Sequence, residues 1–244
     1  MPATGVFATA PQNGAGGDLQ VACRSANAFI PLVRHMKWTL YTADQSRGFM
    51  VEWLLEELGV SYERRLVDLF SGETRSEEYR SIHPLGSVPA LVGDGDPIME
   101  SLAMVLLLAD SVPESGLAPP LTSPHRAAYL QWMVYGTATL EPALGPTFVR
   151  SLSVPPGERA KTATQGEVDG VHRVLAPLSN ALERGTVLPI GFSAADVVIG
   201  SELVWAEEVG LLASHPVARA YLAELKKRPA FAACKFREEP WLGM

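Results

Sequence analysis

The chain has 244 residues and a net charge of −7, with 47% hydrophobic and 19% charged residues. This composition supports one large or two small folded domains, excludes a charge-rich disordered chain, and argues against broad nucleic-acid binding, which needs a basic face. The two cysteines, Cys23 and Cys234, lie too far apart for a disulfide scaffold or a paired zinc site, and no apolar run reaches the roughly 18 residues of a membrane span.

The first 35 residues are rich in alanine and glycine and show weak periodicity. Because they lack a basic start followed by an apolar core, they do not have the pattern of a secretory signal. We expect a folded domain to begin near Met36. Residues 1–35 would then be a disordered tail, or a stretch added because translation is assigned to start at an upstream codon. An organelle-targeting peptide is the alternative, supported by Arg24, Arg34 and the scarcity of acidic residues. The low cysteine usage predicts a reducing, cytoplasmic location.

Residues 36–111 carry the pattern of a small α/β domain. Apolar residues at helical spacing over 49–58, followed by Gly59, predict a helix with a glycine stop. Strands on both sides of this helix imply a parallel pair joined by a crossover helix. In chain order the expected elements are strand 38–41, helix 49–58, strand 61–69, a short helix within 71–82, strand 90–92, a tight turn at 93–96, strand 97–99 and helix 101–111.

The second half of the chain is predicted to be all helical. Residues 112–124 contain four prolines and one glycine and are expected to form a linker, after which strand signals almost vanish. Residues 125–244 are therefore expected to form a helical domain. The expected helices cover residues 126–150 with a bend within 142–146, residues 158–184, residues 193–209 opened by a capping box at 193–196, and residues 216–227.

The segment 86–91 (GSVPAL) places a proline between a β-branched residue and an apolar pair. Because proline has no amide hydrogen for a sheet ladder, Pro89 is expected to end strand pairing. A cis Val88–Pro89 bond would leave the backbone of Val88 free to pair with an extended peptide. Glu100 and Ser101 stand where the next helix begins, and a helix N-terminus with a short hydroxyl can bind a carboxylate. Together these features indicate a site shaped for glutathione.

At this point the chain resembles the cytosolic glutathione transferases, in particular bacterial members of the serine type. The resemblance covers nearly the whole chain from Met36 onward and implies a thioredoxin-like N-terminal domain (β-α-β-α-β-β-α) followed by an all-α helical C-terminal domain. The motifs that carry it, in chain order, are residues 54–59 (LLEELG), 62–63 (YE), 83–91 (HPLGSVPAL), 100–101 (ES) and 193–196 (SAAD).

The resemblance implies a transferase that ionises the thiol of glutathione for attack on a small hydrophobic electrophile, with no metal or other cofactor, as a homodimer. A thiolate is a far better nucleophile than a thiol, so the site must stabilise negative charge on sulfur. The family places the activating residue at the first strand-to-helix junction. Ser46 at the helix start is the favoured candidate and Tyr41 at the strand end is the alternative, while Arg47 or backbone amides remain a third possibility. The alternative structural roles are a helix cap for Ser46 and a core ring for Tyr41.

For the tripeptide, the resemblance implies that Val88 pairs with the cysteinyl backbone beside Pro89, and that Glu100 and Ser101 hold the γ-glutamyl end. Many members have a basic residue, which meets the glycyl carboxylate of glutathione, where this chain has Ser87. Arg47 or His83 could supply the missing positive charge, although a histidine in this loop is more often simply a surface residue.

The electrophile pocket is expected to be lined by Trp132, Tyr135 and Thr139, with Phe148 and Trp241 as further candidates. Aromatic residues at helical spacing are more often core, so this is the alternative structural role. Glutathione-dependent dehalogenation, isomerisation or peroxide reduction would use the same thiolate, and a transferase-like module that only binds is the alternative outside the enzymes. Residues 43–48 contain no cysteine, which disfavours mixed-disulfide chemistry.

Overall fold

The computed structural model describes residues 36–151 and 153–234 of the chain. The expectations for residues 1–35 and for Trp241 lie outside these described residues.

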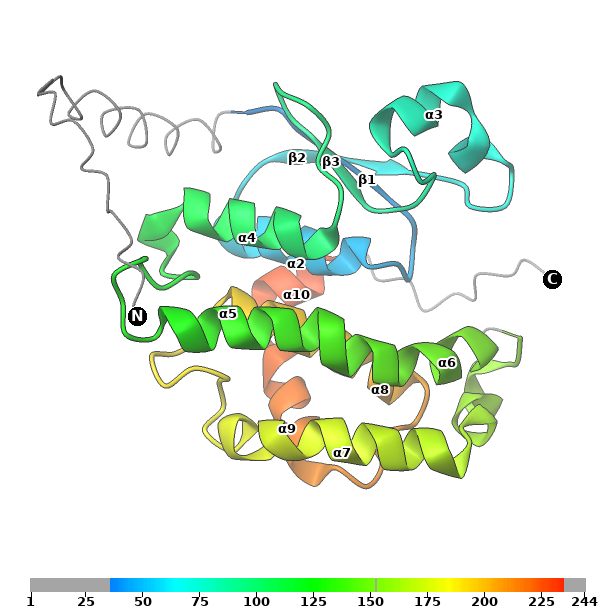
Figure 1. The fold of residues 1–244 in the computed structure, drawn as a ribbon, viewed down its shortest axis with the longest axis vertical. Helices are drawn as coiled ribbons and strands as arrows, with labels where there is room; N and C mark the ends of the chain where they lie inside the picture. Colours follow the sequence, from blue (N-terminus) through cyan, green and yellow to red (C-terminus); the bar gives the residue numbers. More distant parts are fainter. Residues whose placement is uncertain (1–35, 152, 235–244) are drawn as a thin grey trace, which may run out of the picture.

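The N-terminal half is built on a three-stranded mixed sheet of order β2-β1-β3. Its strands are β1 (Trp38–Thr42), β2 (Tyr62–Leu66) and β3 (Ala90–Val92). β1 pairs in parallel with β2 and antiparallel with β3, so that Leu40 lies opposite both Arg64 and Leu91. Figure 1 shows β1 at the centre of the sheet. The predicted parallel β-α-β unit is confirmed.

Helices α2 (Gly48–Leu58) and α4 (Ser101–Ser111) cover one face of the sheet, and α3 (Glu77–Ile82) lies beside it (Figure 1). Successive β1 side chains alternate between the faces, so Leu40 is fully buried while Tyr41 is only half-buried and contacts Tyr79 of α3. Gly59 ends α2 with a φ of 62°, a left-handed conformation that glycine adopts at little cost.

Two predicted strands are shorter in the structure. Residues 97–99 do not form a strand, because only Ile98 pairs with β3, in an isolated bridge in which it exchanges both backbone hydrogen bonds with Leu91. β2 ends at Leu66 rather than at residue 69. The chain turns there because the carboxylate of Asp68 accepts the backbone N–H groups of Phe70 (2.8 Å) and Ser71 (3.0 Å).

The C-terminal half contains helices joined by turns and no strand among its described residues. Its helices are α5 (Arg126–Tyr135), α6 (Glu141–Ser151), α7 (Gln165–Leu182), α8 (Ala194–Glu208), α9 (Pro216–Leu225) and α10 (Pro229–Ala233). Within the described part of the chain, no helix combines the length and the apolar character that a membrane crossing requires.

The expected long helix over 126–150 is interrupted before the predicted position. A π-helical turn, Gly136–Leu140, joins α5 to α6, so the irregularity precedes the 142–146 segment. Pro142 explains this position, because it cannot donate an α-helical hydrogen bond to the carbonyl of Ala138 and the turn before it rewinds.

Helix α7 begins at Gln165 rather than at residue 158. Thr164 and Glu167 form a capping box, in which the amide of Thr164 donates to the Glu167 carboxylate at 2.8 Å. The preceding residues form a 3-10 segment, Pro156–Thr162. Helix α10 was not expected, because the last predicted helix ended at residue 227, although Pro229 suits the first turn of a further helix.

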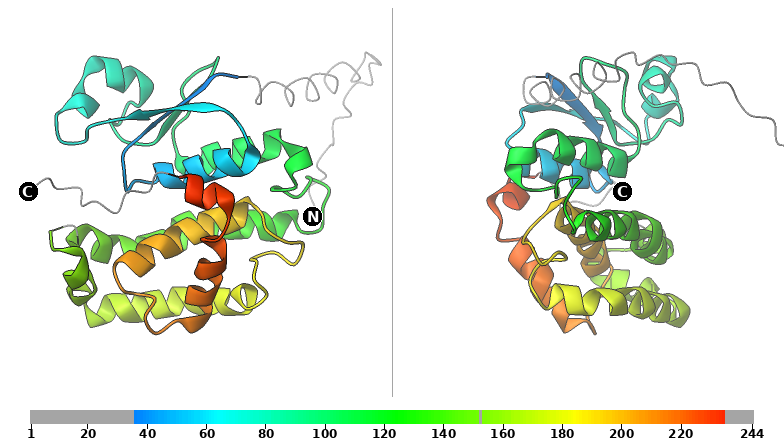
Figure 2. Two further views of the ribbon diagram at one scale, coloured as in Figure 1. Left: turned by 180° about the vertical axis from the view of Figure 1, so that it is seen from behind. Right: turned by 60° about the vertical axis from the view of Figure 1, so that its left-hand side comes forward.

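The two halves pack directly against each other through α2 and α8. The indole of Trp53 on α2 is fully buried, and a Cβ added to Gly200 on α8 would lie 3.0 Å from that ring. Phe231 of α10 closes the same contact, with its ring centroid 5.0 Å from that of Trp53. Seen from behind, α10 lies against α2 (Figure 2). This packing places the start of α2 over α6 and α8.

Asp196 organises the start of α8, as the predicted capping box requires. Its carboxylate is fully buried and accepts the backbone amides of Val187 (2.7 Å) and Ser193 (2.9 Å) and the hydroxyl of Tyr221 (2.8 Å). Burial raises the pKa of Asp196, while these donors oppose the rise. One carboxylate therefore ties the loop before α8, the helix start and α9 together.

We expect Asp196→Ala to lower the free energy of unfolding by about 3 kcal/mol, because several buried donors lose their acceptor together. Tyr221→Phe should cost only about 1 kcal/mol, since it removes one donor and leaves the carboxylate bonded elsewhere. Urea denaturation followed by circular dichroism measures both. A loss below that of Tyr221→Phe for the alanine variant would contradict this role.

Candidate functional site

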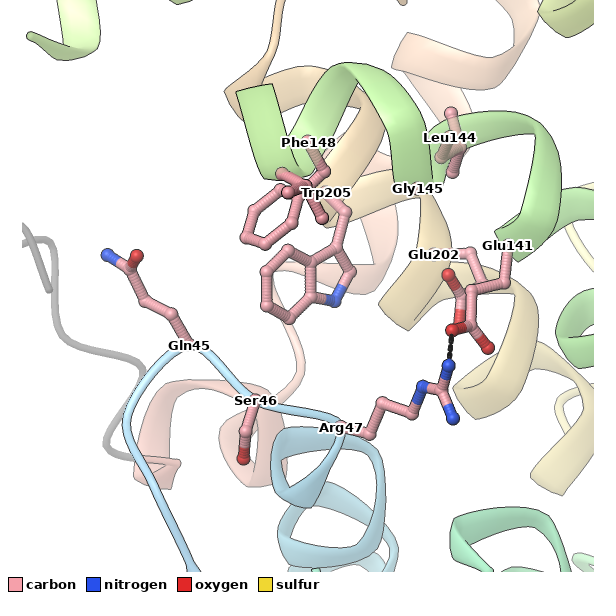
Figure 3. A pocket seen from close by; sticks show the side chains of 10 residues that line it. Gln45, Ser46, Arg47, Glu141, Leu144, Gly145, Phe148, Glu202 and Trp205 are labelled. Carbon is pink, nitrogen blue, oxygen red and sulfur yellow. Dashed lines mark ion pairs between the residues drawn. The ribbon is translucent and has the colours of Figure 1, made fainter. Parts of the chain in front are cut away.

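Two cavities lie at the start of α2. One lies where this start faces α6 and α8 (Figure 3), and the other is bordered by α4 and the π-helical turn. The first, which we call the aromatic cavity, has a volume of about 290 Å³. The second, which we call the helix-start cavity, has a volume of about 400 Å³ and adjoins the first turn of α4. Arg47 and Glu141 line both. The aromatic cavity is also lined by Gln45, Ser46, Leu144, Gly145, Phe148, Val149, Glu202 and Trp205.

An ion pair marks the border between the two cavities. Arg47 precedes the first turn of α2, and its guanidinium pairs with the carboxylate of Glu141 at the start of α6 (Figure 3). Burial raises the pKa of Glu141, and Arg47 counteracts the rise. The pair joins the N-terminal half to the helical half at the point where ligands in the two cavities would meet.

The helix-start cavity contains Glu100 and Ser101, which the structure brings together with Arg47. Glu100 has a φ of 67°, a left-handed conformation that costs a non-glycine residue about 1–3 kcal/mol and is typical of functional sites. Ser101 is the first residue of α4 and is 5% exposed. Because the first N–H groups of a helix lack partners within it, this end can bind an anionic group.

The Val88–Pro89 peptide bond is cis, and the loop before it is held from two sides. The carbonyl of Ser87 accepts from the Tyr79 hydroxyl at 2.7 Å, and its amide donates to Nδ1 of His83 at 3.4 Å. Among the described residues, the backbone of Val88 takes part in no hydrogen bond. It can therefore pair with an extended peptide, although Ser87, Val88 and Pro89 line neither cavity.

The view of His83 as a surface histidine is wrong. Its side chain is 6% exposed and braces the loop through Ser87, so it is not placed to compensate for the missing basic residue. Ser87 itself is exposed.

Ser46 borders the aromatic cavity, but its hydroxyl is engaged in the loop. The hydroxyl donates to the carbonyl of Ala43 at 2.7 Å and accepts the amide of Gly48 at 3.1 Å. In Figure 3 the side chain is directed away from the aromatic rings. Ser46 therefore caps the start of α2, which was its alternative structural role. A cap and an activating role can coexist at a helix N-terminus.

Tyr41 lies on the opposite face of the sheet and lines neither cavity. Its ring meets that of Tyr79 edge-on with centroids 6.1 Å apart, and the guanidinium of Arg65 stacks 5.1 Å above it. Of the two hydroxyl candidates, only Ser46 borders a cavity.

The three residues expected to line the electrophile pocket lie away from both cavities. Trp132 and Tyr135 pack edge to face at 5.4 Å, and the Tyr135 hydroxyl donates to the carbonyl of Val174 on α7 at 2.7 Å, while Thr139 is exposed. The Tyr135 side chain thus turns toward α7. Of the further candidates, Phe148 does line the aromatic cavity, where it forms an aromatic wall with Trp205 at a centroid distance of 4.1 Å.

Sequence reasoning missed several cavity residues. Gln45 is 3% exposed with a φ of 54°, which no motif indicated. Glu141, Glu202 and Trp205 come from helices whose partners only the fold defines. One signal was present for Glu202, because a carboxylate so deep within an apolar helical run needs a reason.

Glu202 is the most unusual group of the site. Its side chain is 3% exposed, lines the aromatic cavity and has no hydrogen bond or ion pair within the described residues. Burial raises its pKa well above the ordinary value, the nearby carboxylate of Glu141 raises it further, and Arg47 partly opposes both. Folding therefore shifts this carboxyl group toward its protonated form.

Neither a metal cluster nor a thiol is present at these cavities within the described chain. No group of three histidine, cysteine or acidic side chains there could hold a metal ion. Cys234 follows α10 and bonds to the carbonyl of Ala230, and burial raises its pKa.

Comparison with known proteins identifies the sequence of residues 36–110 as a match to the glutathione S-transferase N-terminal domain. Glutathione S-transferase 1 of Dianthus caryophyllus is 37% identical over 84 residues, and the match spans only 38% of that relative. Glutathione S-transferase GstA of Escherichia coli O157:H7 is 27% identical over 72% of this chain and 86% of its own. The disulfide-bond oxidoreductase YfcG of Escherichia coli K12 is 28% identical over 78% and 91%.

Solved structures show the same two-part architecture. A glutathione transferase from Methylococcus capsulatus superposes with a TM-score of 0.67 at 28% identity, covering 80% of this chain and 96% of that one. A sphingomonad glutathione S-transferase complexed with glutathione gives a TM-score of 0.64 at 29% identity, with the same coverage. The expected fold class, a thioredoxin-like half followed by a helical half, is confirmed.

We expect Glu202→Gln to stabilise the protein increasingly as pH rises. A carboxyl whose folded pKa lies above its unfolded value binds more protons when folded, so folding loses stability from about pH 4.5 up to the folded pKa, by at most about 1.4 kcal/mol per pH unit. The glutamine variant lacks this loss. Urea denaturation between about pH 5 and pH 8 measures the difference.

Glu207→Gln is the matched control, because Glu207 lies on the same helix at the surface and pairs with Lys226. The difference in unfolding free energy between Glu207→Gln and the unmodified protein should show no comparable rise over this pH range. A flat difference for Glu202→Gln would show that Glu202 is ionised in the folded protein.

Proposed function

Because the chain belongs to the glutathione S-transferase family, we propose that it binds glutathione and directs the thiolate against a small hydrophobic electrophile. The observation that carries this proposal is the meeting of two cavities at the Arg47–Glu141 pair. One has a helix N-terminus and polar groups suited to a peptide end, and the other has aromatic walls suited to an apolar molecule.

Glutathione binds along the loop before β3 and at the start of α4. The free backbone of Val88 pairs with the cysteinyl unit as an added strand. The carboxylate of Glu100 receives the α-amino group of the γ-glutamyl unit, and Ser101 with the helix N-terminus receives its α-carboxylate. Arg47, at the edge of the same cavity, supplies the cation that the Ser87 position lacks.

Ser46 and the first turn of α2 stabilise the thiolate. When glutathione is bound, the Ser46 hydroxyl turns from the neutral carbonyl of Ala43 to the charged sulfur, which is the stronger acceptor. The helix dipole favours negative charge at the same place. The electrophile lies against Phe148 and Trp205 in the aromatic cavity, and the protein acts in the cytoplasm as a homodimer.

A second candidate function is glutathione-dependent disulfide reduction. It is favoured by the similarity to a disulfide-bond oxidoreductase over 91% of that relative. In this reaction the bound thiolate would attack a disulfide sulfur, form a mixed disulfide and release the other sulfur as a thiol. Dehalogenation, isomerisation and peroxide reduction would use the same thiolate, and a module that only binds glutathione is the alternative without turnover.

We expect millimolar glutathione to bind with its thiol largely ionised near neutral pH, which the ultraviolet absorbance of the thiolate measures. Ser101→Ala should weaken this binding about tenfold, or about 1.4 kcal/mol, because the γ-glutamyl carboxylate loses a donor. Ser81→Ala, an exposed serine on α3, is the matched control and should not weaken it.

A panel of aryl and alkyl halides, together with a small organic disulfide, then distinguishes the activities. Conjugation supports the transferase, and reduction of the disulfide without conjugation supports the second candidate. Failure of glutathione to bind at millimolar concentration would overturn the enzyme proposal.

We expect Ser46→Ala to lower kcat at least tenfold, equivalent to about 1.4 kcal/mol of barrier, and to raise the pKa of the bound thiol. Tyr41→Phe should leave both values nearly unchanged, because its ring lies on the other face of the sheet. Since Ser46 also caps α2, the thiol pKa is the decisive measurement: a stability loss alone would leave it unaltered. The reverse outcome for the two variants would transfer the role to Tyr41.

A further inference from the structure

The aromatic cavity contains one polar group without a partner. Glu202 projects from α8 and is 3% exposed, yet no hydrogen bond or ion pair of its carboxyl group occurs within the described residues. A carboxyl group that lines a cavity without a partner is available to a ligand that enters the cavity. Figure 3 shows Glu202 beside Glu141 at one end of the cavity, with Phe148 and Trp205 forming another part of the wall.

Burial and the nearby carboxylate of Glu141 both favour the neutral form of the Glu202 carboxyl group. Within the described residues, the charged groups that influence its ionisation are Glu141, which faces it from α6, and Arg47, which faces it from the start of α2. Arg47 is already paired with Glu141, so a second carboxylate would be both desolvated and repelled. A protonated carboxyl group is a strong hydrogen-bond donor in an apolar cavity.

We infer that Glu202 is the hydrogen-bond donor of the aromatic cavity and selects uncharged electrophiles that carry a carbonyl or similar oxygen acceptor on an aromatic or alkyl body. That the ligand is an electrophile rests on the proposed function. The recognition of its oxygen acceptor by Glu202 does not. Unsaturated ketones and aldehydes are the substrate class that fits this description. In this role Glu202 contacts the substrate and determines specificity.

The cavity walls agree with this class of ligand. The T-shaped Phe148–Trp205 pair offers an aromatic face, and Leu144 adds an aliphatic one. An apolar ligand without an acceptor would leave the Glu202 proton unbonded. A cationic ligand would instead require Glu202 to ionise, which the paired state of Arg47 disfavours.

Three matched ligands test the inference without glutathione. Butylbenzene, 4-phenylbutan-2-one and 4-phenylbutan-2-amine share a four-carbon chain on a phenyl ring and differ in carrying no acceptor, a ketone oxygen or an ammonium group. Ligand-observed NMR titration near neutral pH measures their affinities. We expect the ketone to bind at least tenfold more tightly than butylbenzene, and the amine to bind more weakly than the ketone.

Variants assign the preference to Glu202. Glu202→Leu should remove most of the tenfold difference in affinity between the ketone and butylbenzene, because leucine has similar bulk and no hydrogen-bond donor. Glu202→Gln should retain much of the ratio, since its amide still donates. Glu207→Gln, on the same helix but at the surface, should leave the ratio as it is in the unmodified protein.

Three outcomes would overturn the inference: equal affinity for ketone and butylbenzene, tightest binding of the amine, or an unchanged ratio in a folded Glu202→Leu variant. Each is independent of glutathione binding. If glutathione fails to bind while the ketone preference depends on Glu202, the proposed transferase function fails and the recognition role stands.

A further measurement connects the preference to turnover. With glutathione present, Glu202→Leu should lower kcat/KM for 4-phenylbut-3-en-2-one at least tenfold relative to kcat/KM for benzyl chloride. Equal losses for the two substrates would mean that the variant disturbs the cavity as a whole, and would contradict the selective role.

Discussion

The burial of Trp53 between α2 and α8 is the contact on which the site depends. The indole ring has room there because residue 200 is glycine, and a side chain at that position would collide with the ring or with Leu225. The contact sets the distance between the thioredoxin-like half and the helical half. It thereby holds the start of α2, where Ser46 and Arg47 stand, over α6 and α8. Both cavities are consequences of this packing.

The electrostatics of the site follow from a shortage of positive charge. Among the described residues, Arg47 is the one cation that lines either cavity, while Glu100, Glu141 and Glu202 all line one or both of them. Arg47 forms its ion pair with Glu141. Glu100 is exposed and Glu202 is buried, and neither is paired with Arg47. Burial favours the protonated form of the Glu202 carboxyl group, whereas Glu100 lies where a ligand can approach it from solvent. The two cavities therefore present carboxyl groups in different environments.

Local sequence rules identified much of the fold. The glycine stop at Gly59 and the capping box at Asp196 were predicted correctly, because each depends on neighbours within a few residues. The errors also have local causes. The segment after the turn at 93–96 pairs only through Ile98, and Pro142 moved the helix irregularity to the π-helical turn before it. Thr164 delayed the start of a helix, since its capping partner Glu167 was overlooked.

For the site, the chain order of residues was sufficient to place Glu100 and Ser101 at a helix start and Val88 beside Pro89, because these pairs are adjacent in sequence. The environment of Ser46, the burial of Glu202 and the aromatic wall were decided by the tertiary structure alone. A periodic pattern shows that a helix has an apolar face, but it does not show which neighbour covers that face. For this reason Tyr135 packs on α7 while Trp205 reaches the cavity, and the carboxyl group of Glu202 is buried without a partner among the described residues only because α6 and α8 meet there.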